Sequence, residues 1–180
     1  MLNNVLFLGN SAHVGGGMVN YESRATLNNV LFTGNSATTN GGAISNNGSN
    51  GGIVMTNVTF SGNKAGETGG GMSNFWSTLT MQNVIFWNNE DQTGIGTASS
   101  SVRNHDDKYP ITAIFRYSLV QGCNPSGAWV ASCGTDGGNN LADADPLFVE
   151  TPTPALPPMP TAMYACWLVR PPLIQGMTRW

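Results

Sequence analysis

One short alternation of polar and apolar positions recurs four times along the first half of this 180-residue chain. Each copy reads Asn-Val-x-Phe and ends in Gly-Asn or Asn-Asn. The copies occupy residues 4–10, 29–35, 57–63 and 83–89. Side chains two positions apart lie on one face of an extended strand, so each copy predicts a short strand with one buried face. Because Gly and Asn tolerate positive φ, the end of each copy predicts a corner.

The spacing of the copies predicts a solenoid. Their phenylalanines, at positions 7, 32, 60 and 86, are 25, 28 and 26 residues apart, and a near-constant period of this length is typical of stacked repeats. A turn of that length holds three short strands and three bends, and glycine clusters follow three of the copies. Leucine-rich repeats need more leucines and a helical return segment, and the Gly and Asn density excludes helical repeats. We therefore predict an all-β fold, a right-handed parallel β-helix with four regular coils and one irregular coil.

Stacked coils would align equivalent residues in ladders about 4.8 Å apart. The predicted core ladders contain the valines and phenylalanines of the copies, together with the apolar residue that precedes each copy: Val5, Val30, Val58 and Val84; Phe7, Phe32, Phe60 and Phe86; Leu2, Leu27, Met55 and Met81. The first asparagine of each copy should form a structural ladder at a bend, where the amides satisfy one another: Asn4, Asn29, Asn57 and Asn83.

After the fourth copy the period loosens. Residues 90–112 carry four of the ten acidic residues and are expected to form an exposed excursion from a β-helix that spans residues 1–122. Strand character returns at 114–122, the irregular coil, and residues 123–151 are expected to form a looped extension. Residues 152–180 contain seven of the ten prolines and no asparagine, which predicts a disordered tail.

Composition favours a secreted protein. Only 9% of the residues are charged, whereas about a quarter is usual for globular domains. The net charge of −3 and the lack of a basic stripe argue against nucleic acid or an anionic membrane as partner, and no stretch approaches the roughly 18 apolar residues of a membrane span. The chain enters a repeat at once, without a signal peptide. We therefore expect it to start inside a solenoid and to self-associate edge to edge through an uncapped strand.

The repeated N-V-x-F-x-G-N, interleaved with G-G-A/G-I/M, resembles the right-handed parallel β-helix repeats of large bacterial surface proteins, including the polymorphic outer membrane protein group. Residues 118–122, followed by 139–141 and 143–148, resemble the end of such a helix before a choice-of-anchor region. The resemblance covers about residues 1–150. It implies a fragment of an extracellular or cell-surface passenger with a structural or adhesin-like role, whose anchor lies beyond this chain and whose partners are glycans or surface proteins.

The tail departs from that resemblance. One permitted set of synonymous codons for residues 159–180, read from one nucleotide earlier, encodes DADGDVRLLAGSPAIDTGDDAV. This peptide resembles the D-x-R-L-x-x-G-S-P-A-I-D-x-G motif expected after Ala-Asp-Pro-Leu-Phe in the same family. Our hypothesis is that the residues after about 151 are an out-of-frame translation.

The alternative function is a remnant of a carbohydrate-active β-helix enzyme, because many parallel β-helices are polysaccharide lyases or hydrolases. Such enzymes need converging carboxylates, paired for hydrolysis or holding Ca²⁺ for elimination. Glu22 and Glu67 stand singly, and the positions stacked on Glu22 are Gly48 and Trp76. Four acids of the excursion remain as candidates for a cation or catalytic site, although an acidic run in a loop is usually a solvated surface: Glu90, Asp91, Asp106 and Asp107.

The remaining candidates are interpreted as structural. Asp143 and Asp145 are expected to cap a turn ahead of Pro146 rather than to bind metal. His13 and His105 have no nucleophile at a recognisable spacing and are expected to be exposed.

The cysteines are interpreted as structural rather than catalytic. Cys123 and Cys133 enclose a short loop and could form a disulfide in an oxidising compartment, whereas Cys166 lies in the tail. We predict no catalytic, cofactor-binding or metal-binding residue, and no cofactor.

Overall fold

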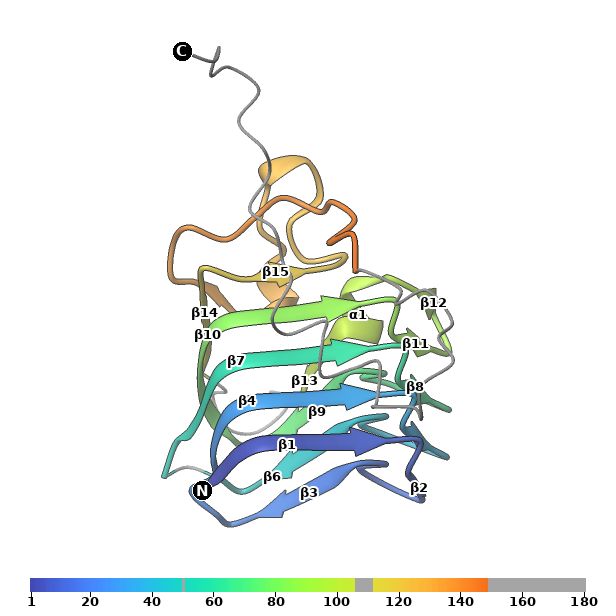
Figure 1. The fold of residues 1–180 in the computed structure, drawn as a ribbon. Coiled ribbons are helices and arrows are strands. Elements are labelled where there is room, and N and C mark those ends of the chain that lie inside the picture. The colour runs from blue at the N-terminus through green and yellow to red at the C-terminus, as the bar shows by residue number, and fades with distance from the viewer. Residues whose placement is uncertain (50, 106–111, 149–180) are drawn as a thin grey trace, which may run out of the picture.

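The computed structural model describes residues 1–49, 51–105 and 112–148, and these form a parallel β-solenoid of about four turns. Three sheets run along it, and the strands of sheet A lie one above another from the N-terminal end upward (Figure 1). Sheet A contains β1 (Leu2–Leu8), β4 (Thr26–Thr33), β7 (Ile53–Ser61), β10 (Thr78–Trp87), β14 (Thr112–Arg116) and β16 (Thr135–Asp136), and β15 (Leu119–Val120) also pairs with β10. The predicted all-β parallel β-helix is confirmed.

Two narrower sheets complete each turn. Sheet B contains β2 (Ser11–Ala12), β5 (Ser36–Ala37), β8 (Lys64–Ala65), β11 (Glu90–Asp91) and the antiparallel β12 (Gly94–Ile95). Sheet C contains β3 (Met18–Tyr21), β6 (Ile44–Asn47), β9 (Met72–Phe75) and β13 (Val102–His105). A coil therefore runs from a long strand of sheet A, through a corner, to a two-residue strand of sheet B and a four-residue strand of sheet C.

The predicted core ladders are confirmed in register. Val5 pairs with Val30, Val30 with Val58, and Val58 with Val84. The phenylalanine rings stack along the solenoid with centroid separations of 4.6, 5.1 and 4.2 Å. Within each coil the apolar side chains turn inward because side chains alternate along the strand, so identical residues fill the core at each level.

Sheets B and C continue into the range expected to be an exposed excursion. Within residues 90–105, β11 pairs with β8 and β13 pairs with β9, and a single helical turn, α1 (Ala98–Ser101), joins them. Val102 lies over Met72 and is 2% exposed. Residues 106–111 fall outside the described residues.

An irregular fifth coil closes the C-terminal end of the core. Phe115 lies over Met81 and Val120 over Phe86. Above it, two 3-10 turns, η1 (Pro125–Gly127) and η2 (Ala131–Cys133), carry a loop whose Trp129 packs against Phe115 with a centroid separation of 5.4 Å.

A disulfide between Cys123 and Cys133 fastens this loop, which decides the pairing that the sequence left open. Both are fully buried and belong to the core. The predicted tail, 152–180, lies outside the described residues. Across the described part of the chain, no helix combines the length and apolar character needed to cross a membrane.

Candidate functional site

The first asparagine of each copy forms the predicted ladder, but on the surface. Asn29 Nδ2 donates to Asn4 Oδ1 at 3.1 Å, Asn57 to Asn29 at 3.0 Å, and Asn83 to Asn57 at 3.2 Å. All four have φ between 53° and 55°, a left-handed conformation within each long strand of sheet A. Their amides satisfy one another as predicted, and their role is structural.

The buried amide ladder is formed by the closing asparagine of each copy, which sequence reasoning assigned only to a corner. Asn10 Nδ2 donates to Asn35 Oδ1 at 2.9 Å, and the same bond joins Asn35 to Asn63 and Asn63 to Asn89 at 3.0 Å. Asn63 Nδ2 also donates to Phe32 O at 3.0 Å. The signal for this ladder was present, because the closing asparagine is kept in all four copies even where Asn88 replaces glycine.

A second buried amide ladder runs inside sheet C. Asn20 Nδ2 donates to Asn46 Oδ1 at 2.7 Å, Asn46 to Asn74 at 2.7 Å, and Asn74 to Asn104 at 2.8 Å. Each of these residues lies two positions after the apolar residue that starts its strand. The residues that follow these asparagines are exposed or half-buried: Tyr21, Asn47, Phe75 and His105.

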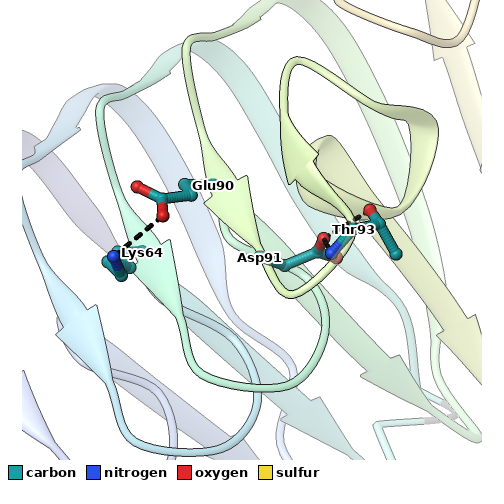
Figure 2. Close-up of polar contacts among 4 residues, drawn as sticks. All are labelled: Lys64, Glu90, Asp91 and Thr93. Carbon is teal, nitrogen blue, oxygen red and sulfur yellow. Dashed lines mark hydrogen bonds and ion pairs between the residues drawn. The ribbon is translucent and has the colours of Figure 1, made fainter.

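Glu90 is the outward-facing residue of β11. Its Oε1 lies 2.8 Å from Lys64 Nζ on β8, and the two side chains are 39% and 60% exposed. The pairing follows from the strand register, which places Glu90 directly over Lys64 (Figure 2). An exposed ion pair of this kind stabilises a fold by about 0 to 1 kcal/mol.

Asp91, by contrast, is 4% exposed, which corrects the expectation that the acidic run is solvated. Its Oδ2 accepts hydrogen bonds from Ser99 Oγ at 2.7 Å and from Gly69 N at 3.3 Å. Its Oδ1 accepts one from Thr93 N at 2.8 Å and another from Thr93 Oγ1. The carboxylate thus fixes the β11–β12 hairpin and the start of α1 to the coil below.

The two adjacent carboxylates point in opposite directions from β11, Glu90 toward Lys64 and Asp91 toward Thr93 (Figure 2). They therefore do not converge on one reacting bond, as paired hydrolytic carboxylates must. Asp106 and Asp107 lie outside the described residues. Among the described residues, no group of three or more His, Cys, Asp or Glu side chains is placed to hold a metal ion.

The other acidic candidates are separate from this strand. Glu67 accepts a hydrogen bond from Asn40 Nδ2 at 3.3 Å. Asp145 Oδ1 accepts one from Leu147 N at 2.9 Å, which confirms its predicted place in the turn around Pro146.

Asp143 also serves the backbone, because its Oδ2 accepts a hydrogen bond from Gly122 N at 2.7 Å. This bond ties the last described loop to the end of the fifth coil.

The histidines differ in environment. His13 is exposed, as predicted, and its Nδ1 lies 2.7 Å from Thr38 Oγ1. His105 is half-buried, which contradicts the prediction that it is exposed. Its ring stacks on Phe75 with a centroid separation of 3.8 Å, and its Nε2 lies 3.2 Å from Ser73 Oγ. The cause is the register of β13 on β9, which places His105 directly over Phe75.

One outward surface combines rings with polar side chains at the corner where sheet C leads back to sheet A. We name it the Tyr21–Trp76 corner. It contains, from three successive coils, Tyr21 and Glu22, Asn47 and Gly48, and Phe75 and Trp76. Tyr21, Asn47 and Phe75 are aligned by strand register, and the residue that follows each of them continues the alignment. Tyr21 is 65% and Trp76 38% exposed.

The backbone at this corner requires a left-handed conformation in each coil. Glu22 has φ 46°, Gly48 has φ 66° and Trp76 has φ 49°. Glycine adopts this conformation without strain, whereas a bulky side chain there costs on the order of 1–3 kcal/mol. Two positions of the corner, Glu22 and Trp76, therefore have a strained backbone that glycine would relieve.

Residues 29–47 match the Chlamydia polymorphic membrane protein (Chlamydia_PMP) repeat. They run from Asn29 within β4 to Asn47 at the end of β6, through all three sheets of the second coil. The match and the fold fit a polymorphic outer membrane protein-like β-helix. In this β-helix, the matched repeat supplies members of all three asparagine ladders. A search of curated proteins and a search of solved structures each found no match.

Proposed function

We propose that this polymorphic outer membrane protein-like β-helix is an extracellular, non-catalytic passenger with a structural, adhesin-like role. The observation that carries the proposal is the match of residues 29–47 to a repeat of a polymorphic membrane protein. The stack acts as a rigid support, and its outward corners contact glycans or proteins of a neighbouring surface.

The placement of the acidic side chains supports a non-catalytic role. Glu90 is neutralised by Lys64, and Asp91 is used four times as an acceptor inside the fold. A catalytic carboxylate needs access to a substrate, whereas Asp91 is 4% exposed.

The disulfide supports an extracellular location. Cys123 and Cys133 are joined and fully buried at the end of the core. Disulfides of this kind persist in oxidising compartments such as the cell surface and are rare in the cytosol.

Adhesion of coated beads tests the proposal. Beads carrying the 180-residue chain should adhere to cultured cell layers more than beads carrying the same chain after denaturation and alkylation. Equal adhesion of the two kinds of bead would contradict the proposal, because the denatured chain lacks the ordered corners.

A parallel assay measures cleavage of acidic polysaccharides, by reducing-end release and by absorbance of unsaturated uronates. We expect no turnover. Turnover that is abolished by Glu90→Gln, a variant that leaves the buried side chains unchanged, would instead support the alternative of a carbohydrate-active enzyme.

A further inference from the structure

Two side-chain oxygens are buried without a hydrogen-bond donor at the C-terminal end of the solenoid. They are Asn124 Oδ1 and Asp143 Oδ1, and among the described residues no N–H or O–H group donates to either of them. Asn124 is 5% exposed, and Asp143 is half-buried with this oxygen enclosed. Nearly all buried polar atoms in proteins have a partner, so each exception requires an explanation.

The two residues are in direct contact. Asp143 N donates to Asn124 O at 3.1 Å, and Asp143 Oδ2 accepts a hydrogen bond from Gly122 N at 2.7 Å. The Asn124 side chain lies on the segment just before Asp143, because its Nδ2 donates to Leu141 O at 3.0 Å. Both unpartnered oxygens therefore belong to one small contact, between residues 122–124 and residues 140–143.

The orientation of the Asn124 amide is fixed by its neighbours. Its Nδ2 faces two backbone carbonyl oxygens, Asn140 O at 3.4 Å and Leu141 O at 3.0 Å. Exchanging Nδ2 and Oδ1 would place an oxygen against two acceptors, where no hydrogen bond can form. Oδ1 therefore stays an acceptor without a donor, which is a suitable ligand for a cation.

Asp91 shows how this fold buries a carboxylate without a cation. Both of its oxygens accept hydrogen bonds from neighbouring groups. In Asp143, by contrast, Oδ2 has a donor within the described chain and Oδ1 has none. An enclosed anionic oxygen without a partner is strongly unfavourable, so the Asp143 carboxylate needs a positive group beside Oδ1.

The described residues around Asp143 do not supply that positive group. Residues 112–148 contain three aspartates and one arginine: Asp136, Asp143, Asp145 and Arg116. Arg116 Nε donates to Gly137 O, and within the described part of the chain Arg116 forms no ion pair. The negative balance of this end of the chain favours a free cation.

We propose that Asp143 and Asn124 bind one calcium ion. Carboxylate and amide oxygens are the ligands that Ca²⁺ prefers, and water completes its coordination. Zinc prefers thiolates and imidazoles, and Cys123 and Cys133 are joined in the disulfide. The site has one carboxylate and one amide, so it differs from the clusters of three or more His, Cys, Asp or Glu side chains that the described residues lack.

The ion links the end of the fifth coil, at Gly122 and Asn124, to the last described loop. This inference goes beyond the proposed passenger role and does not depend on adhesion. It also revises the interpretation from sequence, which assigned Asp143 to a turn rather than to a metal ion.

The test is calorimetric titration of the intact 180-residue chain with CaCl2 after removal of bound cations by a chelator. We expect one ion per chain with a Kd of about 10⁻⁴ to 10⁻³ M, as in extracellular calcium modules. Saturating Ca²⁺ should raise the melting temperature by about 2–6 °C, because the ion binds the folded state. Mg²⁺ should bind more weakly, since it requires a stricter octahedral geometry.

Asp143→Asn should lower the affinity for Ca²⁺ tenfold or more and remove the rise in melting temperature. Asp145→Asn is the matched control, because it removes the same charge from the same loop at an exposed position. This control should bind Ca²⁺ within about threefold of the unmodified chain.

Asn124→Asp provides a second variant in case Asp143→Asn does not fold. A second carboxylate should lower the melting temperature in chelator, and Ca²⁺ should then bind at least threefold more tightly, because calcium affinity rises with ligand charge. The proposal is overturned if the unmodified chain binds no Ca²⁺, binds Mg²⁺ equally well, or loses as much affinity in Asp145→Asn as in Asp143→Asn. Unchanged or weaker binding by folded Asn124→Asp would also overturn it.

Discussion

Asp91 lies directly above Ala65 in the stack, and both side chains are buried, at 4% and 1% exposure. The position is alanine in the first three coils and a carboxylate in the fourth. A buried carboxylate can replace alanine here because both of its oxygens accept hydrogen bonds. The donors come from the β11–β12 hairpin, the start of α1 and Gly69 in the coil below.

Asp91→Ala should therefore destabilise the fold although it restores the residue of the coils below. Four hydrogen bonds to an ionised acceptor are lost, and the expected loss is about 2–4 kcal/mol in the free energy of unfolding. Urea denaturation followed by circular dichroism measures it. Glu90→Gln, the neighbouring control, should change the same quantity by less than about 1 kcal/mol, and equal effects would contradict this assignment.

The buried and surface asparagine ladders should respond differently to substitution. Asn63→Ala leaves the buried Asn35 N–H without its acceptor and Phe32 O without its donor, at a cost of about 2–4 kcal/mol. Asn57→Gly, in the surface ladder, should be neutral or stabilising, because glycine adopts φ 54° more readily. Thermal unfolding of both variants measures the two changes in stability. A larger loss in Asn57→Gly would show that the surface ladder carries the stability.

Reduction of the Cys123–Cys133 disulfide should loosen the C-terminal end of the solenoid. The bond joins residues 10 apart and holds the loop that places Trp129 on Phe115. In a Cys166→Ser background, reductant should lower the free energy of unfolding by about 2–4 kcal/mol. The Cys123→Ala/Cys133→Ala variant should be insensitive to reductant, and a shift in that variant would assign the effect elsewhere.

The 180-residue chain should associate through the edge of β1. Leu2, Val5 and Phe7 are only partly buried, whereas their counterparts in the next coil, Leu27, Val30 and Phe32, are fully buried. Light scattering should show concentration-dependent oligomers on the order of tens of micromolar, and a designed polar cap before Leu2 should give a monomer. A stable monomer without the cap would refute the edge argument.

The coding DNA tests the hypothesis on residues 152–180. A neighbouring reading frame should encode the D-x-R-L-x-x-G-S-P-A-I-D-x-G motif downstream of Ala-Asp-Pro-Leu-Phe. If neither alternative frame contains the motif, the tail belongs to the protein as translated.

The valine and phenylalanine ladders could be predicted from sequence because a two-residue alternation recurs four times at one period. The buried asparagine ladders could not, since the pattern is the same whether the closing asparagine caps a corner or turns inward. The inward direction is set by contacts between coils, such as Asn63 with Phe32 O. The burial of Asp91 could not be predicted for a similar reason, because it follows from the strand register that places Asp91 over Ala65.

The candidate surface could be predicted only in part. Sequence alignment of the coils placed Gly48 and Trp76 over Glu22, and the structure has this order. The positive φ values that mark Glu22 and Trp76 as strained depend on the backbone path of the corner. His105 was wrongly assigned to the surface. Its stacking on Phe75 depends on the register of β13 on β9, and the sequence does not show that register.

The direction of the hydrogen bonds between the asparagine side chains affects how the number of coils can change in evolution. In both buried ladders each coil donates toward the following coil, and in the surface ladder each donates toward the preceding one. Coils joined by these ladders therefore present one fixed set of donors and acceptors to the coil above and the complementary set to the coil below. Recombination between repeats that duplicates or deletes one whole coil, such as the 28 residues from Asn29 to Thr56, rejoins matching faces. The number of coils is thus a trait that a single genetic event can alter while the interior stays intact.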